Sequence, residues 1–553
     1  MALTTTPTND LDLVVQGELT LAGSEISAFD PATDRLFVTS SVGLQIVSIV
    51  DPSMPALVRT IDFTGAPFSF TNDVNSVAVK NGIVAVAVAA DPSTSAGKVF
   101  LLDAQGNLLK SIDVGALPDN LTFTPDGSKI LVANEAEASL QGVTPAVDPE
   151  GSVSIITIPS PLQGGAAAAT VVTATFTAFN GQEALLRNEG VRIFPNKTVA
   201  QDLEPEYIAV SADGKTALVT LQEANAIAIL DIATATFKDI VPLGLKNFSS
   251  LLTDFSDRDN AAGTGQAIKF ENGNPVFGIY QPDSIASFIG ADGKQYYVIA
   301  NEGDDRNDFL TGGETTTVGN ANYVLDPSLS ATLKANSELG RLVVSNIGSG
   351  STDPNITQLR GDTDGDGDID QIISYGGRSF SILNDKGEIV FDSGTHGEQV
   401  VAATGLTSAG GNYDDGRSDN KGTEPEGITV GTINGKTYAF VGLERAGGVI
   451  AYEVTDPTNV TFTQFATNAG DLNPEGLTFI SAGDSPTGEE ILAVTNETSN
   501  TLTLYAVTSE VDYTLQLLHF ADGEAGLLAS QTAPFLAALV DAFEEQYAHS
   551  ITL

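Results

Sequence analysis

Short runs of β-branched and apolar residues recur along most of the chain, separated by turns rich in glycine, asparagine and aspartate. Alternation of apolar and polar residues over a few positions is typical of half-buried β-strands, whereas long stretches with helical periodicity are nearly absent. The pattern therefore predicts an all-β fold.

One sequence unit recurs along the chain. Five segments begin with a proline–acid pair, continue through a strand, a turn and a second strand, and end in another acid; they span residues 118–135, 205–223, 282–302, 425–444 and 474–497. Four of the turns read TPDGSK, SADGKT, GADGKQ and TINGKT, and the last is a longer loop around residues 486–488. Asp-Gly and Asn-Gly adopt the positive φ that tight hairpins need. Two degenerate copies, at residues 25–38 and 75–88, bring the count to seven units.

A third strand is predicted after each pair, at residues 45–50, 98–103, 152–157, 226–231, 341–346, 449–454 and 501–506. Fourth strands follow in most units, as at residues 56–63 and 108–115. Four strands per unit, at a period of ~45 residues or more, predict a seven-bladed β-propeller with four-stranded blades. The last unit supplies three strands, so residues 11–21 are expected to close the ring as its fourth. A β-sandwich or a solenoid is the alternative, and neither would need that strand.

The chain is expected to have three regions: a disordered N-terminus at residues 1–10, the propeller at 11–508, and a C-terminal α/β fragment at 509–553. Insertions at roughly 159–200, 245–280 and 303–420 interrupt the third, fourth and fifth units. Long loops in a repeat protein are usually functional or ordered by a metal.

Charge and composition exclude several classes of function. The chain has 25 Lys and Arg against 71 Asp and Glu, a net charge of −46, which repels nucleic acid and anionic membranes and favours cations. It has no cysteine and only three histidines, so disulfides and Cys-zinc sites are excluded and a Ser-His-Asp site is not expected. No apolar run approaches a membrane span, and the N-terminal residues lack the features of a signal peptide.

The densest local motif is a run of alternating aspartates that resembles a calcium loop. Its carboxylates are Asp362, Asp364, Asp366, Asp368 and Asp370. Glycine stands at the sixth position, where calcium loops turn sharply, but the twelfth position is Ile373, so the bidentate glutamate of an EF-hand is missing. Strand-like sequence follows, as in the calcium hairpins of integrin-type propellers. We expect calcium here because the aspartates repel one another without a cation; a merely solvated acidic loop is the alternative.

The repeat also predicts a ring of acids. In each hairpin, the acid that begins the first strand and the acid that follows the second lie at the same end, and the first strand of a blade lines the channel. Ten acids should therefore gather around one channel mouth: Asp119, Glu135, Glu206, Glu223, Asp283, Glu302, Glu426, Glu444, Glu475 and Glu497. They either cap backbone N–H groups and pair with arginines, such as Arg306, Arg378, Arg417 and Arg445, or they hold a cation or a basic ligand.

Several motifs carry a resemblance to a known family. They include DPATDRLFVTS, NSVAVKNGIVAVAV, GALPDNLTFTPDGSKILVANE, DPEGSVSII, YQPDSIASF, GDTDGDGDIDQIISYGGRSFSI and RSDNKGTEPEGI. Residues of about 10–508 resemble the choice-of-anchor I family of secreted bacterial propellers. Its members occur alone or ahead of alkaline phosphatase or 5′-nucleotidase-type domains. The resemblance implies an extracellular or cell-surface place, with cell-surface or matrix components as partners, and establishes no catalytic role for the propeller.

After Val507 the pattern changes to a strand, a loop, a helix at residues 534–547 and a further strand, an order that suits a parallel sheet. The stretch LLHFADGEAG resembles the first metal motif of 5′-nucleotidase-type metallophosphoesterases. Asp522 aligns with the metal-binding Asp of that motif, while Glu524 replaces its His. The remaining ligands of such a two-metal site would lie downstream, so the chain as given is expected to be inactive. A C-terminal helix packed on the propeller is the alternative.

Three functions remain open at this stage. The first is a calcium-stabilised scaffold or recognition propeller of an exported metallophosphoesterase, a metal-dependent phosphoric ester hydrolase. The second is a stand-alone cell-surface binding or assembly protein without catalysis. The third is a calcium-dependent phosphatase within the propeller, like the β-propeller phytases, which the scarcity of basic residues among the repeated motifs disfavours.

Overall fold

A computed structural model describes residues 3–144, 146–160, 163–307, 309, 313–404 and 413–509. Within these residues the chain is mostly β, as the sequence predicts, with seven four-stranded antiparallel sheets and one five-stranded sheet. The expected C-terminal fragment, including Asp522 and Glu524, lies outside the described residues from position 510 onward.

The first four sheets along the chain each use consecutive strands, paired in order from the first to the fourth. They consist of β2 (Ser27–Asp30), β3 (Arg35–Ser40), β4 (Gly43–Ser48) and β5 (Ala56–Ile61); β6 (Val74–Lys80), β7 (Ile83–Val88), β8 (Ala96–Asp103) and β9 (Leu108–Ala116); β10 (Pro118–Phe123), β11 (Lys129–Asn134), β12 (Ser152–Thr157) and β13 (Thr170–Thr175); and β14 (Pro205–Val210), β15 (Thr216–Leu221), β16 (Ala226–Asp231) and β17 (Thr236–Pro242).

Of the last three four-stranded sheets, the first and the third include strands that are distant in sequence, whereas the second uses consecutive strands. They consist of β20 (Ile285–Ile289), β21 (Gln295–Asn301), β25 (Ser379–Asn384) and β26 (Ile389–Asp392); β27 (Pro425–Ile433), β28 (Lys436–Leu443), β29 (Gly448–Glu453) and β30 (Thr461–Thr467); and β31 (Pro474–Ile480), β32 (Glu490–Asn496), β33 (Thr501–Ser509) and β1 (Leu11–Thr20). In the last of them β1 pairs antiparallel with β33, from Leu11 opposite Ser509 to Thr20 opposite Thr501.

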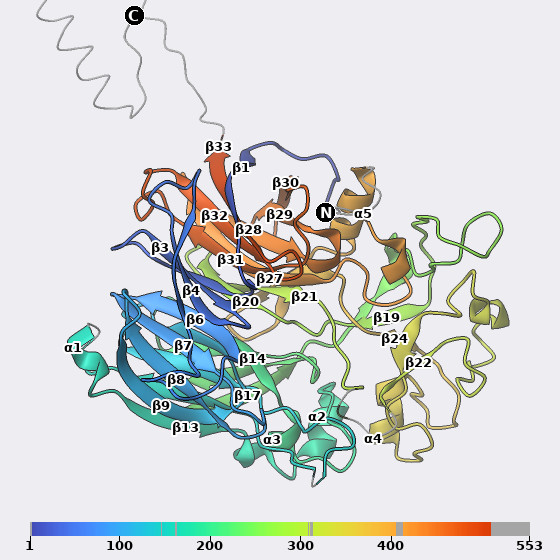
Figure 1. Ribbon diagram of the computed structural model, residues 1–553. Helices are drawn as coiled ribbons and strands as arrows, with labels where there is room; N and C mark the ends of the chain where they lie inside the picture. The colour runs from blue at the N-terminus through green and yellow to red at the C-terminus, as the bar shows by residue number, and fades with distance from the viewer. Residues whose placement is uncertain are drawn as a thin grey trace, which may run out of the picture. The chain divides into compact units, whose positions relative to one another are not determined.

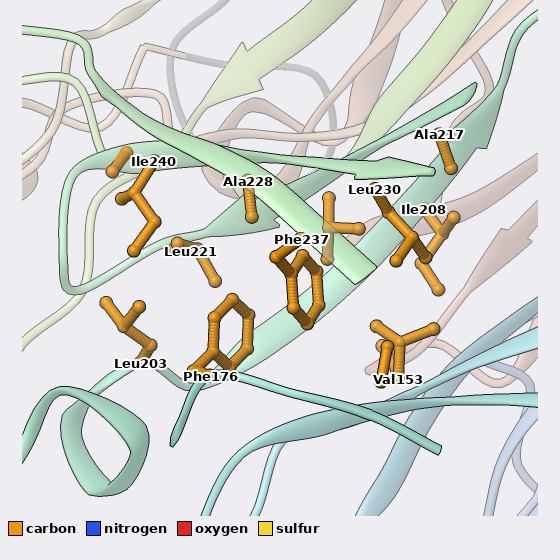
Figure 2. Packing of buried hydrophobic residues seen from close by; sticks show 14 of the residues in the cluster. Val153, Phe176, Leu203, Ile208, Ala217, Leu221, Ala228, Leu230, Phe237 and Ile240 are labelled. Carbon is orange, nitrogen blue, oxygen red and sulfur yellow. The ribbon is translucent and has the colours of Figure 1, made fainter. Parts of the chain in front are cut away.

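The first strands of the seven sheets contact one another in order: β2 contacts β6, and contacts continue through β10, β14, β20, β27 and β31 back to β2. This arrangement of four-stranded antiparallel sheets is typical of a β-propeller. Between neighbouring sheets the inward-facing side chains interdigitate. Figure 2 shows such a core, in which Phe176 and Phe237 stack with ring centroids 3.9 Å apart among buried aliphatic residues.

The five-stranded sheet is built within the long insertions. It consists of β18 (Leu245–Asn247), β19 (Val276–Ile279), β24 (Ile372–Ser374), β23 (Val343–Ser345) and β22 (Thr315–Thr317), in that order. Figure 1 shows β19, β24 and β22 in one group, apart from β7 and β8. The sheet has its own core around Phe248, Val276 and Ile372.

One predicted strand is wrong. Residues 341–346 do not form the third strand of the fifth unit, because β25 occupies that place and pairs with β21 from Tyr296 opposite Asn384 to Asn301 opposite Ser379. The predicted segment contains β23, which pairs with β22 and β24 in the five-stranded sheet. Both segments carry strand-forming residues, and strand propensity does not select a partner.

Helices are short and lie in the connections. They are α1 (Gln163–Ala166), α2 (Glu183–Glu189), α3 (Val199–Asp202), α4 (Pro354–Thr357) and α5 (His396–Ala403), with 3-10 turns η1 (Thr177–Phe179), η2 (Phe248–Ser250), η3 (Ala331–Lys334), η4 (Gln358–Arg360), η5 (Asp415–Arg417) and η6 (Glu444–Ala446). Within the segment for which the sequence predicts disorder, the Thr8 backbone N–H donates to the Phe462 carbonyl at 3.0 Å, and the Thr4 carbonyl lies 2.9 Å from His396 Nε2. Among the described residues no helix is long and apolar enough to cross a membrane.

Candidate functional site: the ring of acids and the aspartate loop

The repeated hairpins bring their two acids to the same end through one backbone feature. In four sheets the proline that begins the first strand pairs with the end of the second strand: Pro118 with Asn134, Pro205 with Leu221, Pro425 with Leu443, and Pro474 with Asn496. In each sheet the register then shifts before the third residue after the proline. The first acid of each hairpin therefore sits in a bulge, which re-aims its side chain relative to the regular strand.

Three of the predicted acids form one cluster, which we call the Glu206 cluster: Glu135, Glu206 and Glu223. One carboxylate oxygen from each lies within 4.8 Å of the other two. The three side chains are buried, with exposed fractions of 9%, 7% and 5%. Oε2 of Glu206 and Oε2 of Glu223 have no hydrogen-bond partner among the described residues. Orphaned carboxylate oxygens in a buried site are costly and require an explanation.

Little positive charge reaches the Glu206 cluster. Arg306 is the base beside it: its Nη2 lies 3.8 Å from Glu223 Oε2, but its Nε donates to Glu204 Oε2 at 2.7 Å. The same guanidinium also faces Asp202 at 3.8 Å. One cation is therefore shared among three acids. Burial, reinforced by the charges of neighbouring acids, raises the pKa of Glu206 and of Glu135 well above the usual range. Burial also raises the pKa of Glu223 to about 7, although Arg306 opposes the shift.

A second group, the Glu424 cluster, combines the predicted Glu302 and Glu444 with Glu424, again with one oxygen of each within 4.8 Å of the others. Here bases approach closely. Arg417 Nε donates to Glu424 Oε1 at 2.9 Å, and Lys421 Nζ donates to Glu302 Oε1 at 2.9 Å. Arg445 bridges Glu424 Oε2 at 3.3 Å and Glu444 Oε1 at 3.0 Å.

The bases change the electrostatics of the Glu424 cluster. Although Glu424 is buried, Lys421, Arg417 and Arg445 hold its pKa below the usual range. Burial alone would lower the pKa of Lys421, but the charges of Glu302, Glu424 and Asp304 outweigh it and raise that pKa above the usual range. Glu444 keeps a pKa raised to about 8 by burial and by Glu424 and Glu302. This cluster is an internal network of ion pairs.

The other five predicted acids belong to neither cluster. Asp119, Asp283, Glu426 and Glu475 are half-buried, whereas Glu497 is exposed. Burial raises the pKa of Asp119 to about 7 and that of Asp283, Glu426 and Glu475 well above the usual range. The negative charges of neighbouring acids also raise the pKa values of the last three. Glu302 acts in this way on Asp283, and Glu497 acts on Glu475. Although these residues are partly exposed, Oε2 of Glu426 and Oε2 of Glu475 are buried and have no hydrogen-bond partner among the described residues.

The four arginines proposed as partners are engaged, mostly with acids outside the predicted ring. Arg306 bonds to Glu204, Arg417 and Arg445 bond to Glu424, and the fully buried Arg378 lies 3.3 Å from Glu398. Sequence reasoning missed Glu204, Glu424 and Lys421. Glu204 and Glu424 each precede the proline of a repeat, so the acid–proline–acid pattern was a usable signal for them, and Lys421 lies only three residues before Glu424.

The aspartate loop brings its carboxylates together in two overlapping groups. Oxygens of Asp362, Asp364 and Asp370 lie within 4.8 Å of one another, and so do oxygens of Asp326, Asp368 and Asp370. Gly365 and Gly367 turn the backbone with φ of +81° and +105°, and β24 follows, as the sequence indicated. Asp326 was not predicted; it comes from a separate segment that meets the loop through a bridge between Leu325 and Ile369.

The donor set of this loop fits a hard cation. Backbone N–H groups bond some aspartates, as Gly365 N–H does with Asp362 Oδ1 at 2.8 Å and Thr363 N–H with Asp370 Oδ2 at 2.7 Å. Asp368 Oδ1 is buried without a hydrogen-bond partner among the described residues, and burial together with Asp366 raises the pKa of Asp368 to about 6. Carboxylate oxygens from a wrapping loop are the ligands that calcium prefers.

Comparison with known proteins places the chain in a family. The profile of the choice-of-anchor I domain matches residues 25–457. The chain belongs to the choice-of-anchor I family. Domains of this family are associated with extracellular or cell-surface proteins. The match ends before residue 458, so it does not extend to the C-terminal region.

Two curated relatives share parts of the chain. Gigasin-3a of Magallana gigas is 29% identical over 173 residues, which cover 26% of this chain and 60% of that protein. A mesenchyme-specific cell surface glycoprotein of Strongylocentrotus purpuratus is 25% identical over 301 residues, covering 48% of this chain and 36% of that protein. The chain thus spans less than two thirds of the length of either relative.

Solved structures with some likeness to the chain include hydrazine synthase of Kuenenia stuttgartiensis, with a TM-score of 0.43, 14% identity and coverage of 88% of this chain and 96% of that one. The β-propeller domain of Cps50 (Swd1) from Myceliophteria thermophila gives a TM-score of 0.42 at 9% identity, covering 90% of this chain and 100% of that one.

Proposed function

We propose that the chain is an extracellular, calcium-binding, seven-bladed propeller that acts as a scaffold or recognition module. The ring closes through β1, which is the fourth strand of the last blade. Calcium binds the loop of Asp362, Asp364, Asp366, Asp368 and Asp370, and the ring of acids takes cations. The observation that carries the proposal is the choice-of-anchor I match over residues 25–457, combined with the unbroken series of contacts among the seven first strands.

Calcium in the loop would fasten the insertion between β21 and β25. The loop pairs with the Asp326 segment through the Leu325–Ile369 bridge. An ion among these carboxylates would therefore link the loop to the Asp326 segment, which is distant from it in sequence. Binding to the folded state alone raises stability by mass action, by about 2.7 kcal/mol at a hundredfold excess over Kd.

The test uses Asp364→Ala with Asp366→Ala. Excess chelator should lower the melting temperature of the unmodified chain and expose residues 350–380 to protease, and the double variant should behave like the chelated protein with or without calcium. Asp385→Ala, an exposed aspartate outside the loop, serves as the control. Identical melting and cleavage with calcium and with chelator would contradict calcium binding by the loop.

The parent protein is proposed to be an exported metallophosphoesterase of the alkaline phosphatase or 5′-nucleotidase type, with Asp522 and Glu524 as the first two ligands of its metal pair. A two-metal site needs ligands from several strand ends, so hydrolysis of a phosphomonoester is expected from a longer protein and not from residues 1–553. Metal-dependent turnover by the 553-residue chain that survives Asp522→Ala would instead place the chemistry in the propeller.

A stand-alone cell-surface binding or assembly protein is the second candidate. The similarity to a mesenchyme-specific cell surface glycoprotein favours it, because that relative's name assigns it to the cell surface. Sequencing the full gene distinguishes the two candidates: a phosphoesterase domain downstream supports the first, and its absence supports the second.

A further inference from the structure

The ten predicted acids are not equivalent, because some have basic side chains close to their carboxylates and others do not. In the Glu424 cluster the described structure supplies three bases within 3.5 Å of the carboxylates of Glu302, Glu424 and Glu444. In the Glu206 cluster Arg306 is the base in contact, at 3.8 Å from one oxygen of Glu223, and its closest bond is to Glu204. The negative charge of three glutamates is therefore balanced by nearby bases in the Glu424 cluster but largely unbalanced in the Glu206 cluster.

We propose that the Glu206 cluster is a built site for one hard divalent cation, with calcium as the best match, held by Glu135, Glu206 and Glu223. This inference rests on the cation binding proposed for the ring of acids and names the residues and the ion that account for it.

The geometry of the cluster suits an ion of calcium's size. Calcium–oxygen distances are about 2.3–2.6 Å, so oxygens on opposite sides of the ion lie about 5 Å apart and adjacent ones lie closer. The three candidate oxygens all lie within 4.8 Å of one another. Calcium accepts six to eight oxygen ligands in flexible geometry, so water or a second oxygen of a carboxylate would have to complete the set.

The orphaned oxygens are the independent sign of a ligand. Glu206 Oε2 and Glu223 Oε2 are buried, lack hydrogen-bond partners among the described residues and belong to side chains that are more than nine-tenths buried. A divalent ion among the three carboxylates would supply partners for such oxygens and would offset most of the cluster's charge, which Arg306, bonded to Glu204, offsets only in part. Without an ion, the repulsion can be relieved by protons bound between the carboxyl groups. A cluster built for an ion should bind added metal, whereas a cluster that is simply neutralised by protons should not.

The chain positions the three ligands on rigid elements. Glu206 lies in β14 next to its bulge, Glu135 directly follows β11, and Glu223 lies two residues after β15. The strands β10, β11, β14 and β15 belong to neighbouring sheets whose first strands are in contact. An ion at this point would therefore link two adjacent blades as well as neutralise charge.

The experiment is calorimetric titration of the 553-residue chain, freed of metal, with calcium, magnesium and manganese chlorides. All variants carry Asp364→Ala and Asp366→Ala, which remove the loop site. In this background we expect one equivalent of calcium to bind, and Glu206→Gln with Glu223→Gln to weaken that binding at least about tenfold. The matched control is Glu302→Gln with Glu444→Gln, which removes the same charge from the Glu424 cluster and should leave the affinity within about twofold.

Each result has a distinct meaning. Equal weakening by both glutamine pairs would show diffuse attraction by the acid ring and overturn the built site. Calcium binding by the unmodified chain that disappears in the Asp364→Ala, Asp366→Ala background would overturn the cluster site and leave the proposed loop site standing. If the glutamine pair fails to fold, anomalous diffraction from manganese-soaked crystals of the unmodified chain decides: density between the three carboxylates supports the site, and density absent there contradicts it.

Discussion

The Glu206 cluster and the Glu424 cluster are built from the same repeated hairpin but have opposite electrostatics. Both place three glutamates with oxygens within 4.8 Å of one another. Glu424 is fully buried and yet has a lowered pKa, because Lys421, Arg417 and Arg445 surround it; Glu206 has a strongly raised one, because burial and its acidic neighbours act without a close base. The pKa of a buried carboxylate thus depends on which charged side chains lie close to it.

The difference originates in the insertion that follows β26 and in the turn that follows β28. Arg417 and Lys421 belong to the segment between α5 and β27, and Arg445 lies in η6, directly after β28. The hairpins around Glu206 receive only Arg306, from the segment after β21, and several acids compete for it. The repeat sets where the acids lie, and the insertions set whether they are paired.

The largest effect in this comparison is expected from Glu424→Gln. Removing one partner of a buried ion pair typically costs about 3–5 kcal/mol, because the bases are left without compensation. Denaturant unfolding at pH 7 measures the loss. Glu189→Gln removes the same charge from an exposed helix end and should change stability by less than about 0.5 kcal/mol.

The cost of Glu424→Gln should depend on pH. The folded-state pKa of Glu424 lies below its ordinary value of 4.5, so its ionised form contributes stability that is fully present above that value and is lost as pH falls through the folded-state pKa. The gap between the two proteins should be complete at pH 7 and should shrink below pH 4.5. A gap that stays constant from pH 7 to pH 3.5 would show that packing, and not charge, makes Glu424 important.

A smaller effect of opposite sign is expected from Glu206→Gln. In chelator the variant should be at least as stable as the unmodified chain at pH 8, because glutamine avoids the cost of burying an ionised carboxylate or of keeping it protonated. Excess calcium should reverse the order, since the variant loses an ion ligand. Thermal unfolding with chelator and with calcium measures both. A loss of stability in chelator as large as that of Glu424→Gln would mean that the two clusters do not differ as described.

Ionic strength should produce the smallest effect. The exposed Glu497 and the half-buried acids of the ring repel one another through solvent, so raising sodium chloride from 0.05 to 0.5 M in chelator should stabilise the chain slightly. The same salt should change the cost of Glu424→Gln less, because the Glu424 carboxylate is buried and salt screens it poorly. The comparison of melting temperatures at the two salt concentrations measures this contrast.

The sequence by itself determined the repeating β-units and the end of each hairpin at which its acids lie. Alternation of apolar and polar residues indicates a strand with one buried face, and Asp-Gly and Asn-Gly indicate hairpin turns. Both are local sequence features, so the strands and turns could be predicted from the sequence. The pairing Pro205 with Leu221 puts Glu206 and Glu223 at one end, as the pattern predicts. The run of five aspartates in the loop was equally apparent, because they are close together along the chain, whereas Asp326 comes from a separate segment.

Only the tertiary structure decided which strand completes the fifth unit and which acids are paired. Residues 341–346 and β25 both have strand-forming sequence, and the choice between them depends on partners contributed by distant insertions. Likewise, nothing beside Glu424 or Glu206 in the sequence shows that Lys421 Nζ lies 2.9 Å from Glu302 Oε1 while Arg306 is bonded to Glu204. Arg417 and Arg445 are close in sequence to Glu424 and Glu444 and were named as candidate partners. However, contacts such as Lys421 with Glu302 and Arg306 with Glu204 join residues about 100 positions or more apart and appear only in the tertiary structure.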